Sequence, residues 1–369
     1  MEQVIVSEPL NEKKKKRIDY VDTCKFIGIF LVTFGHVKEQ GLDVNLIYSF
    51  HLPLFFTIAG FTLNVDMPFK DYLFSKIKSY LIPLFFLDLL SILVAVLFML
   101  GTGHAAEVNL PYFFGHFSSM IEQKRYFALW FIPSLFVATL IAYPLCIIGK
   151  KHQWLTLIGA LIALGFAIAY NYYRGERLAW NVDASLFGVF FLTIGYLFRW
   201  VVNKVPFLMK NRFRALLFGF ASLAFGLLIA YICYQEYHLH LEMWSGQYKK
   251  YYLVIPSAVF GSIGMIFLSK AMTNPVFSEL GKGSIVVLAL QQDLGIKLWK
   301  NYIVPNWYTH INMLEKNSFD RFAYAFCGVA FTFVIAYLVY YLILFSPLAF
   351  MIHQKQKRLI SRKEIQLDK

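Results

Sequence analysis

Charged residues are scarce in this chain. Only 15% of its 369 residues are Asp, Glu, Lys or Arg, whereas about a quarter of a typical soluble protein is charged. Cysteines are few and far apart, at Cys24, Cys146, Cys233 and Cys327. Their spacing fits neither a metal site nor a disulfide framework, so no metal is expected. No gap between apolar runs is long enough for a soluble domain, and no repeat of fixed period occurs.

Apolar residues dominate instead. Hydrophobic residues make up 58% of the chain and aromatic residues 18%, with a mean hydropathy of +0.55. Apolar runs of about 20 residues, the length that crosses a bilayer, recur from end to end. The sequence predicts an all-α, polytopic membrane protein with about ten transmembrane helices in one bundle, as a single domain over 1–369. The expected spans are 20–37, 46–64, 80–100, 126–148, 154–173, 182–202, 213–234, 251–269, 283–299 and 323–349.

The formal net charge is +13. Such a charge can indicate nucleic-acid binding, but the basic residues are scattered through links and tails and form no single patch. No nucleic-acid partner is therefore expected. Lys and Arg concentrate in alternate links, which predicts that both termini are cytoplasmic. Residues 1–17 and 350–369 would be basic cytoplasmic tails in contact with membrane lipids, and the first apolar run would be a retained helix.

Three ionisable residues interrupt the first two apolar runs. Lys25 lies near the start of the first run, His36 lies at its end, and His51 opens the second. A charged or titratable group at membrane depth is costly and usually faces a bundle interior or a wet cavity. We therefore expect these three side chains to line a reaction site.

The spacing of Lys25 and His36 supports this hypothesis. They are 11 residues apart, about three helical turns, which places them on one helix face roughly 16 Å apart. Asp22 precedes Lys25 by three residues and can pair with it. Gly28 and Gly35 share the same face and allow a thin ligand to approach the backbone. The pattern predicts a groove with an ammonium group at one end and an imidazole at the other.

These segments resemble a known family. The run from Lys25 to His36, K-F-I-G-I-F-L-V-T-F-G-H, is followed by F-H-L-P-L-F-F-T-I-A-G-F at 50–61. Together they resemble the signature of the integral membrane acyltransferase family 3, in the branch of the fucose 4-O-acetylase relatives. Weaker similarities follow in order along most of the chain: L-I-P at 81–83, A-L-W-F-I-P-S-L-F at 128–136, V-D-A-S-L-F-G-V-F-F-L-T-I-G-Y at 182–196 and L-G-K-G-S at 280–284.

The resemblance implies an O-acyltransferase of the plasma membrane. Its donor would be cytoplasmic acyl-CoA, with acetyl-CoA expected, and its acceptor a sugar hydroxyl on a cell-surface or exported glycan. Lys25, Gly28 and Gly35 would bind the donor, since an ammonium group suits a phosphate. His36, and with it His51, would be catalytic, either as a general base for the acceptor hydroxyl or as an acylated intermediate.

Candidate acceptor-binding residues are Trp130, Asp183 and Gln291. Trp130 is either a belt residue at the membrane interface or a stacking surface for a sugar. Asp183 is either a structural hydrogen-bond partner or a substrate ligand. Many family members have His where Gln291 stands, but an amide can still bind substrate. Gln291, Ser284 or a backbone N–H could supply the hydrogen bond that a developing oxyanion needs.

Each site residue also has a plainer interpretation. His36 could be a hydrogen-bonded interface histidine, His51 could support the helix hairpin, and Lys25 could pair with Asp22 or extend to the interface. The rival function is a transporter or flippase for a lipid-linked sugar or polysaccharide, with the buried ionisable groups as its path. No pattern in the sequence indicates an oligomeric state.

Overall fold

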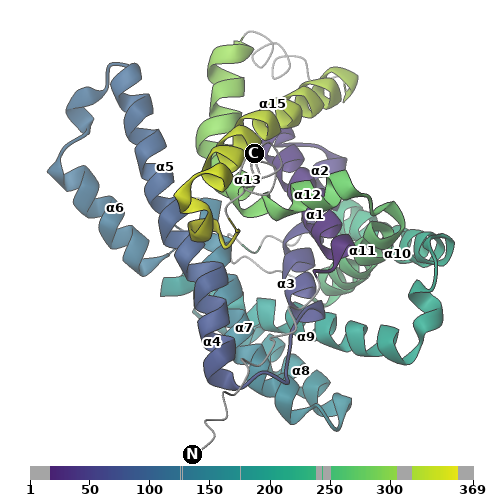
Figure 1. The fold of residues 1–369 in the computed structure, drawn as a ribbon. Helices are drawn as coiled ribbons and strands as arrows, with labels where there is room; N and C mark the ends of the chain where they lie inside the picture. The colour runs from purple at the N-terminus through teal and green to yellow at the C-terminus, as the bar shows by residue number, and fades with distance from the viewer. Residues whose placement is uncertain are drawn as a thin grey trace, which may run out of the picture.

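Helices form all of the described regular structure in the computed structural model (Figure 1). The structure describes residues 17–355, except 125, 127, 175, 238–242, 244–250 and 306–317. Most of both expected tails therefore lies outside the described residues. Within the described part, nine helical segments are long and apolar enough to cross a membrane, and no strand occurs. The predicted all-α, polytopic architecture is confirmed.

The long helices are α1 (Asp19–Lys38), α5 (Ile82–Gly101), α7 (Phe131–Ile148), α8 (Gln153–Tyr173), α9 (Val182–Lys204), α10 (Arg212–Tyr237), α11 (Tyr251–Met272) and α15 (Ser318–Phe345). The shorter helices are α2 (Leu42–Tyr48), α3 (His51–Phe61), α4 (Phe69–Lys76), α6 (Leu110–Glu122), α12 (Pro275–Lys282) and α13 (Ser284–Leu290). Short 3₁₀ segments are η2 (Ala105–Glu107), η3 (Ala128–Trp130), η4 (Ala179–Asn181), η5 (Pro206–Met209) and η8 (Pro347–Ile352). Three π-helical turns, η1 (Ile77–Leu81), η6 (Gln291–Ile296) and η7 (Trp299–Ile303), complete the described elements.

The expected span at 283–299 is not one continuous α-helix. It forms α13 and then passes into the π-helical turns η6 and η7. The change of hydrogen-bond pattern begins at Gln291, where three polar residues interrupt the apolar run. π-helical turns inside helices occur often at functional sites. This segment is therefore a candidate part of the site.

A second π-helical turn lies between α4 and α5. The two helices and η1 form one helical segment from Phe69 to Gly101. Pro83 stands in the first turn of α5 and has no N–H to donate to the carbonyl four residues earlier, that of Ser79. The missing bond explains why the hydrogen-bond pattern loosens here.

Glycines let the central helices cross closely. A Cβ atom on Gly60 of α3 would lie 1.7 Å from the Leu192 carbonyl oxygen of α9, and one on Gly195 of α9 would lie 2.0 Å from the Thr57 oxygen of α3. A Cβ on Gly281 of α12 would lie 1.9 Å from the Asp22 oxygen of α1. Such contacts suit helix association in lipid, where van der Waals packing replaces the hydrophobic effect. They hold α3 against α9 and α12 against α1.

Large apolar side chains cover the outward faces of the peripheral helices. They include Leu89, Leu93 and Leu97 on α5, Phe113, Phe114 and Phe117 on α6, Leu161, Ile162 and Phe166 on α8, and Leu217, Phe220 and Leu228 on α10. Figure 1 shows α5 and α6 reaching away from the bundle on one side. An exposed apolar surface of this extent suits contact with lipid tails.

Candidate functional site

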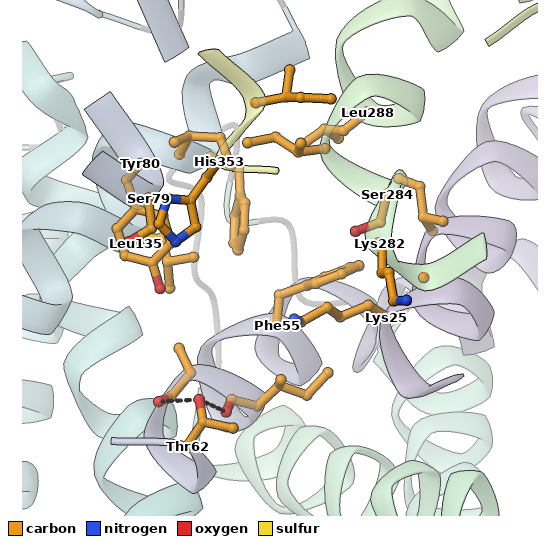
Figure 2. Close-up of a pocket in the computed structure, with 18 of the residues that line it drawn as sticks. Lys25, Phe55, Thr62, Ser79, Tyr80, Leu135, Lys282, Ser284, Leu288 and His353 are labelled. Atoms are coloured by element: carbon orange, nitrogen blue, oxygen red, sulfur yellow. Dashed lines mark hydrogen bonds between the residues drawn. The ribbon is translucent and has the colours of Figure 1, made fainter. Parts of the chain in front are cut away.

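A cavity of about 320 Å³ lies among α1, α3, η1, α7, α12, α13 and the segment after α15. We call it the Lys25 cavity. Figure 2 shows Lys25 beside Lys282 and Ser284 on one side, with Tyr80 and His353 across from them. Apolar side chains line the rest: Ile29, Val32, Leu52, Phe55, Ile58, Ala59, Phe131, Ile132, Leu135, Ile285, Leu288 and Ile352. The cavity thus combines a few polar groups with mostly apolar walls, as ligand-binding pockets do.

The Lys25 cavity is cationic. Its lining contains the basic residues Arg17, Lys25, Lys76 and Lys282 and no carboxylate. The buried carboxylate of Asp22 accepts from Arg17 Nε at 2.5 Å and from Lys25 Nζ at 3.0 Å. Lys282 Nζ pairs with Glu279 Oε2 at 2.5 Å. Four basic side chains and only two carboxylates give the cavity a surplus of positive charge, so it attracts anions.

His353 closes this cavity from the C-terminal side. It follows η8 with φ of 55°, a left-handed conformation that ends the turn and brings the imidazole to the cavity wall. Burial, together with the nearby charges of Arg17 and Lys78, holds the pKa of His353 below its ordinary value. The imidazole is therefore neutral at pH 7 in the free protein. A bound anion would stabilise its protonated form and raise its pKa.

A second cavity, of about 290 Å³, lies at the other end of α1. We call it the His36 cavity. Its lining consists of Gly35, His36, Glu39, Tyr48, Gln292, Ile296 and Lys300. Gln292 Nε2 lies 3.3 Å from His36 Nε2 and 3.4 Å from Nδ1. Lys300 Nζ forms an ion pair with the Glu39 carboxylate and lies 3.4 Å from the carbonyl oxygen of His36.

A buried polar contact stands on α1 between residues that line the two cavities, although neither of its partners lines a cavity itself. Thr33 Oγ1 of α1 donates to Gln291 Oε1 at 2.7 Å. On α1 it stands between Val32, which lines the Lys25 cavity, and Gly35, which lines the His36 cavity. The Gln291 side chain is 1% exposed, and its Nε2 has no partner among the described residues. If the amide oxygen and nitrogen were exchanged, one of the two atoms would still face Thr33 and the other would still lack a partner. Leaving a buried amide group unpaired costs about 1–3 kcal/mol, which suggests a ligand as its partner.

The expected single groove from Lys25 to His36 is replaced by two cavities that share no lining residue. Lys25 and His36 do each face a cavity from α1. The face of Gly28 is occupied, because a Cβ there would lie 2.9 Å from Phe55. Gly35 lines the His36 cavity, and a Cβ there would lie 2.5 Å from the Tyr48 ring.

Comparison with known families decides the class of the protein. A family model described as an acyltransferase domain matches residues 18–341, from the residue before α1 to near the end of α15. The chain belongs to acyltransferase family 3. Neither a curated protein nor a solved structure matches it. With its apolar helices, this membership indicates a multi-pass membrane acyltransferase.

In this acyltransferase, His51 lies next to Tyr48, a lining residue of the His36 cavity, and is not itself part of the lining. The His51 side chain is buried, and Nδ1 lies 3.2 Å from the Ile47 carbonyl oxygen. Its ring packs against Tyr48, with ring centroids 4.8 Å apart, and Tyr48 in turn lies 6.3 Å from the His36 ring. His51 therefore reaches the cavity through Tyr48. A catalytic role for His51 stays a prediction, and this geometry favours positioning.

Trp130 and Asp183 lie outside the linings of both cavities. Both are buried. Asp183 Oδ1 accepts from the Leu178 backbone N–H at 3.2 Å, and the Trp130 carbonyl accepts from the Asn181 side chain at 2.8 Å. These contacts hold the start of α9 against the start of α7. Substrate binding by either residue stays a prediction.

Sequence reasoning missed five residues of the His36 cavity: the apolar Ile296 and, with polar side-chain atoms, Glu39, Tyr48, Gln292 and Lys300. Glu39 and Lys300 look like ordinary charges at the ends of apolar runs, and Tyr48 like a loop aromatic. Gln292 had a signal, because it adjoins Gln291 inside an apolar run. Among the described residues, no group of three or more His, Cys, Asp or Glu could hold a metal ion.

Proposed function

We propose that this protein is an O-acyltransferase of the plasma membrane, related to the fucose 4-O-acetylase branch. It takes an acetyl group from acetyl-CoA in the Lys25 cavity and passes it to a sugar hydroxyl in the His36 cavity. The acceptor is a cell-surface or exported glycan. Both termini are cytoplasmic, so the Lys25 cavity opens toward the cytoplasmic donor. The motif from Lys25 to His36 and the family membership support this proposal.

The observation that carries the proposal is the contrast in charge between the two ends of α1. The Lys25 cavity has a surplus of cations and suits the phosphates of a CoA thioester. The His36 cavity holds one ion pair and a half-buried imidazole, and suits a neutral hydroxylated acceptor. The cationic cavity and the polar cavity lie at opposite ends of the membrane-spanning helix α1. This arrangement suits a donor and an acceptor that approach from opposite faces of the membrane.

The chemistry follows from this placement. His36 accepts the proton of the acceptor hydroxyl as that oxygen attacks the thioester carbon. The C–S bond breaks, the CoA thiolate leaves, and the proton held by His36 returns to the thiolate. The unpaired amide of Gln291 donates to the carbonyl oxygen as negative charge develops on it. Because the two cavities are separate here, the acyl group reaches His36 when the Thr33–Gln291 contact opens.

The remaining residues bind and position. Lys25 pairs with a donor phosphate without destabilising the fold, because the buried carboxylate of Asp22 still has Arg17 as a partner. The donor arm follows the Gly28–Gly35 face of α1 once Phe55 turns aside. His51 holds Tyr48 beside the base. Removing a general base of this kind typically costs 10²–10⁴-fold in rate.

The test uses purified protein in proteoliposomes with radiolabelled acetyl-CoA and glycans from a host that lacks the modification. Wild type should form a base-labile ester on the glycan, and His36→Ala should lower this transfer by about 10²–10⁴-fold with unchanged melting temperature and acetyl-CoA binding. His152→Ala, which changes an exposed histidine outside both cavities, is the matched control. Glycan movement across the bilayer without ester formation, in both wild type and His36→Ala, would instead establish a transporter.

A further inference from the structure

The ion pair at the mouth of the His36 cavity is asymmetric. The side chain of Lys300 is 12% exposed, whereas that of Glu39 is 47% exposed. Lys300 also lies 3.4 Å from the backbone oxygen of His36, which fixes the ammonium group next to the base. The pair therefore offers one donor and one acceptor side by side, with no net charge. Neighbouring hydroxyls of a sugar can use both at once, one donating to the carboxylate and one accepting from the ammonium.

The backbone holds Glu39 in place. It ends α1 with φ of 64°, a region that non-glycine residues rarely adopt. Its N–H donates to the Gly35 carbonyl at 2.9 Å. Because this conformation turns the chain at the end of α1, the carboxylate meets Lys300 of η7. Backbone strain of this kind persists where the surroundings over-determine it, and it gathers at functional sites.

Tyr48 supplies a flat aromatic surface to the lining of the same cavity. Its ring lies between His36 and His51, at 6.3 Å and 4.8 Å from their centroids. The missing side chain of Gly35 makes room for it, since a Cβ there would lie 2.5 Å from Tyr48 Cε1. An aromatic ring with an apolar body and a polar tip suits the C–H face of a sugar ring whose edges carry hydroxyls.

We propose that Glu39, Lys300 and Tyr48 form a subsite for a neutral pyranose beside His36. Tyr48 packs against the sugar ring, while Glu39 and Lys300 bind two neighbouring hydroxyls and leave the next one facing the imidazole. The ammonium group of Lys300 is already neutralised by Glu39, and the carboxylate is the more exposed of the two groups, so an acidic sugar gains no free cation here and the subsite favours neutral rings. The inference rests on the proposed function, because it assigns the acceptor to this cavity.

Binding can be measured without turnover. The protein in nanodiscs is titrated with methyl glycosides of neutral pyranoses and with the methyl glycoside of a uronic acid, using saturation-transfer NMR. The variants are Glu39→Gln, Lys300→Met, Tyr48→Leu, Tyr48→Phe and the exchanged pair Glu39→Lys/Lys300→Glu. Lys297→Met is the control, since Lys297 lies in the same segment but faces the Phe98 ring, 4.7 Å away, outside the cavity lining.

Wild type should bind at least one neutral pyranoside and reject the uronic acid. Glu39→Gln and Lys300→Met should each weaken binding by about 10- to 100-fold, the value of a hydrogen bond to a charged group. The exchanged pair should recover much of the loss, Tyr48→Phe should retain binding and Tyr48→Leu should lose it. Lys297→Met should bind like wild type.

Two outcomes overturn the subsite: wild type that binds none of the neutral pyranosides, or binding that survives in Glu39→Gln, Lys300→Met and Tyr48→Leu. A melting curve for each variant separates lost contacts from lost folding, and the Tyr48→Phe variant keeps the test valid if Tyr48→Leu unfolds. Acetyl transfer is measured in parallel. Pyranoside binding that depends on these residues, without any acetyl transfer, overturns the proposed function and leaves the subsite standing.

Discussion

Thr33 and Gln291 join α1 to η6 through a hydrogen bond of 2.7 Å between Oγ1 and Oε1. The two residues are 258 positions apart in the sequence, and both are buried. Their contact stands on α1 between residues that line the two cavities, and it leaves the other half of the Gln291 amide without a partner among the described residues. A contact that served stability alone would gain from two apolar side chains. We therefore interpret it as part of the reaction site.

The double variant Thr33→Val/Gln291→Leu should separate catalysis from stability. Replacing both partners of a buried hydrogen bond by apolar groups of similar shape is nearly neutral or stabilising, so the melting temperature should stay the same or rise. Acetyl transfer should fall by about 10²–10³-fold, the usual cost of removing an oxyanion donor. Transfer rates and melting curves in detergent check both expectations.

Thr193→Val is the control for this double variant. The Thr193 hydroxyl donates to the Val189 carbonyl within its own helix, at 2.7 Å, and Thr193 is buried away from both cavities. It should leave transfer unchanged. Full transfer activity in Thr33→Val/Gln291→Leu would rule out a chemical role for the amide.

Lys25→Met should weaken donor binding without unfolding the protein. Asp22 loses one cation but keeps Arg17 Nε at 2.5 Å, so no buried carboxylate is left unpaired. The Lys25 side chain is 34% exposed, which screens its charge, so we expect about a tenfold loss of CoA affinity. Calorimetric titration with CoA measures this loss, and the dependence of affinity on salt should become shallower.

Lys270→Met provides the comparison. Lys270 lies over the Tyr20 ring, 5.1 Å from its centroid, and does not line the Lys25 cavity. Its loss removes the same net charge from the chain but should leave CoA affinity nearly unchanged. Equal losses in the two variants would mean that only overall charge matters and that the cavity is not the donor site.

CoA affinity should depend on pH through His353. In the free protein its pKa lies below the ordinary value of 6.5 because of burial, Arg17 and Lys78, so the imidazole is neutral at pH 7. Bound phosphates favour the imidazolium and raise the pKa, so binding takes up a proton. Affinity should be highest at low pH and fall as pH rises through the bound-state pKa, by about tenfold for each unit between the two pKa values.

His353→Gln should flatten this dependence, whereas His152→Gln, an exposed histidine outside the cavity, should preserve it. Because the ligand phosphates also titrate, the variants are compared with the same ligand over the same pH range. Identical pH profiles for wild type and His353→Gln would remove His353 from donor binding.

Gly60→Ala should destabilise the bundle. The new Cβ would lie 1.7 Å from the Leu192 carbonyl oxygen, which is backbone and cannot rotate away. Forcing α3 and α9 apart should cost about 1–3 kcal/mol. Gly165→Ala on α8 meets nothing within 4 Å and should be neutral or stabilising by up to about 1 kcal/mol. Melting temperatures of the two variants in the same detergent give the comparison, and similar values would contradict the close crossing.

Most of the spans were predictable because the bilayer imposes a local rule. A helix that crosses it needs about 20 apolar residues, and a charged residue inside such a run stands out at once. Lys25 and His36 were found in this way, and both face cavities in the structure. The polar interruption after Leu290 was also visible, although its π-helical form was not, since that depends on bonding within the folded segment.

The partners of these residues were decided only by tertiary structure. Gln292 and Lys300 reach His36 and Glu39 from 256 and 261 positions away, and Phe55 and Tyr48 rest against the Gly28 and Gly35 positions of α1. By itself the sequence determined which segments enter the membrane and which groups are too polar to face lipid. Both depend on the free energy of moving individual side chains between water and lipid. Only the crossing of helices decided which polar groups meet, because those distances depend on side chains and glycines of several distant segments at once.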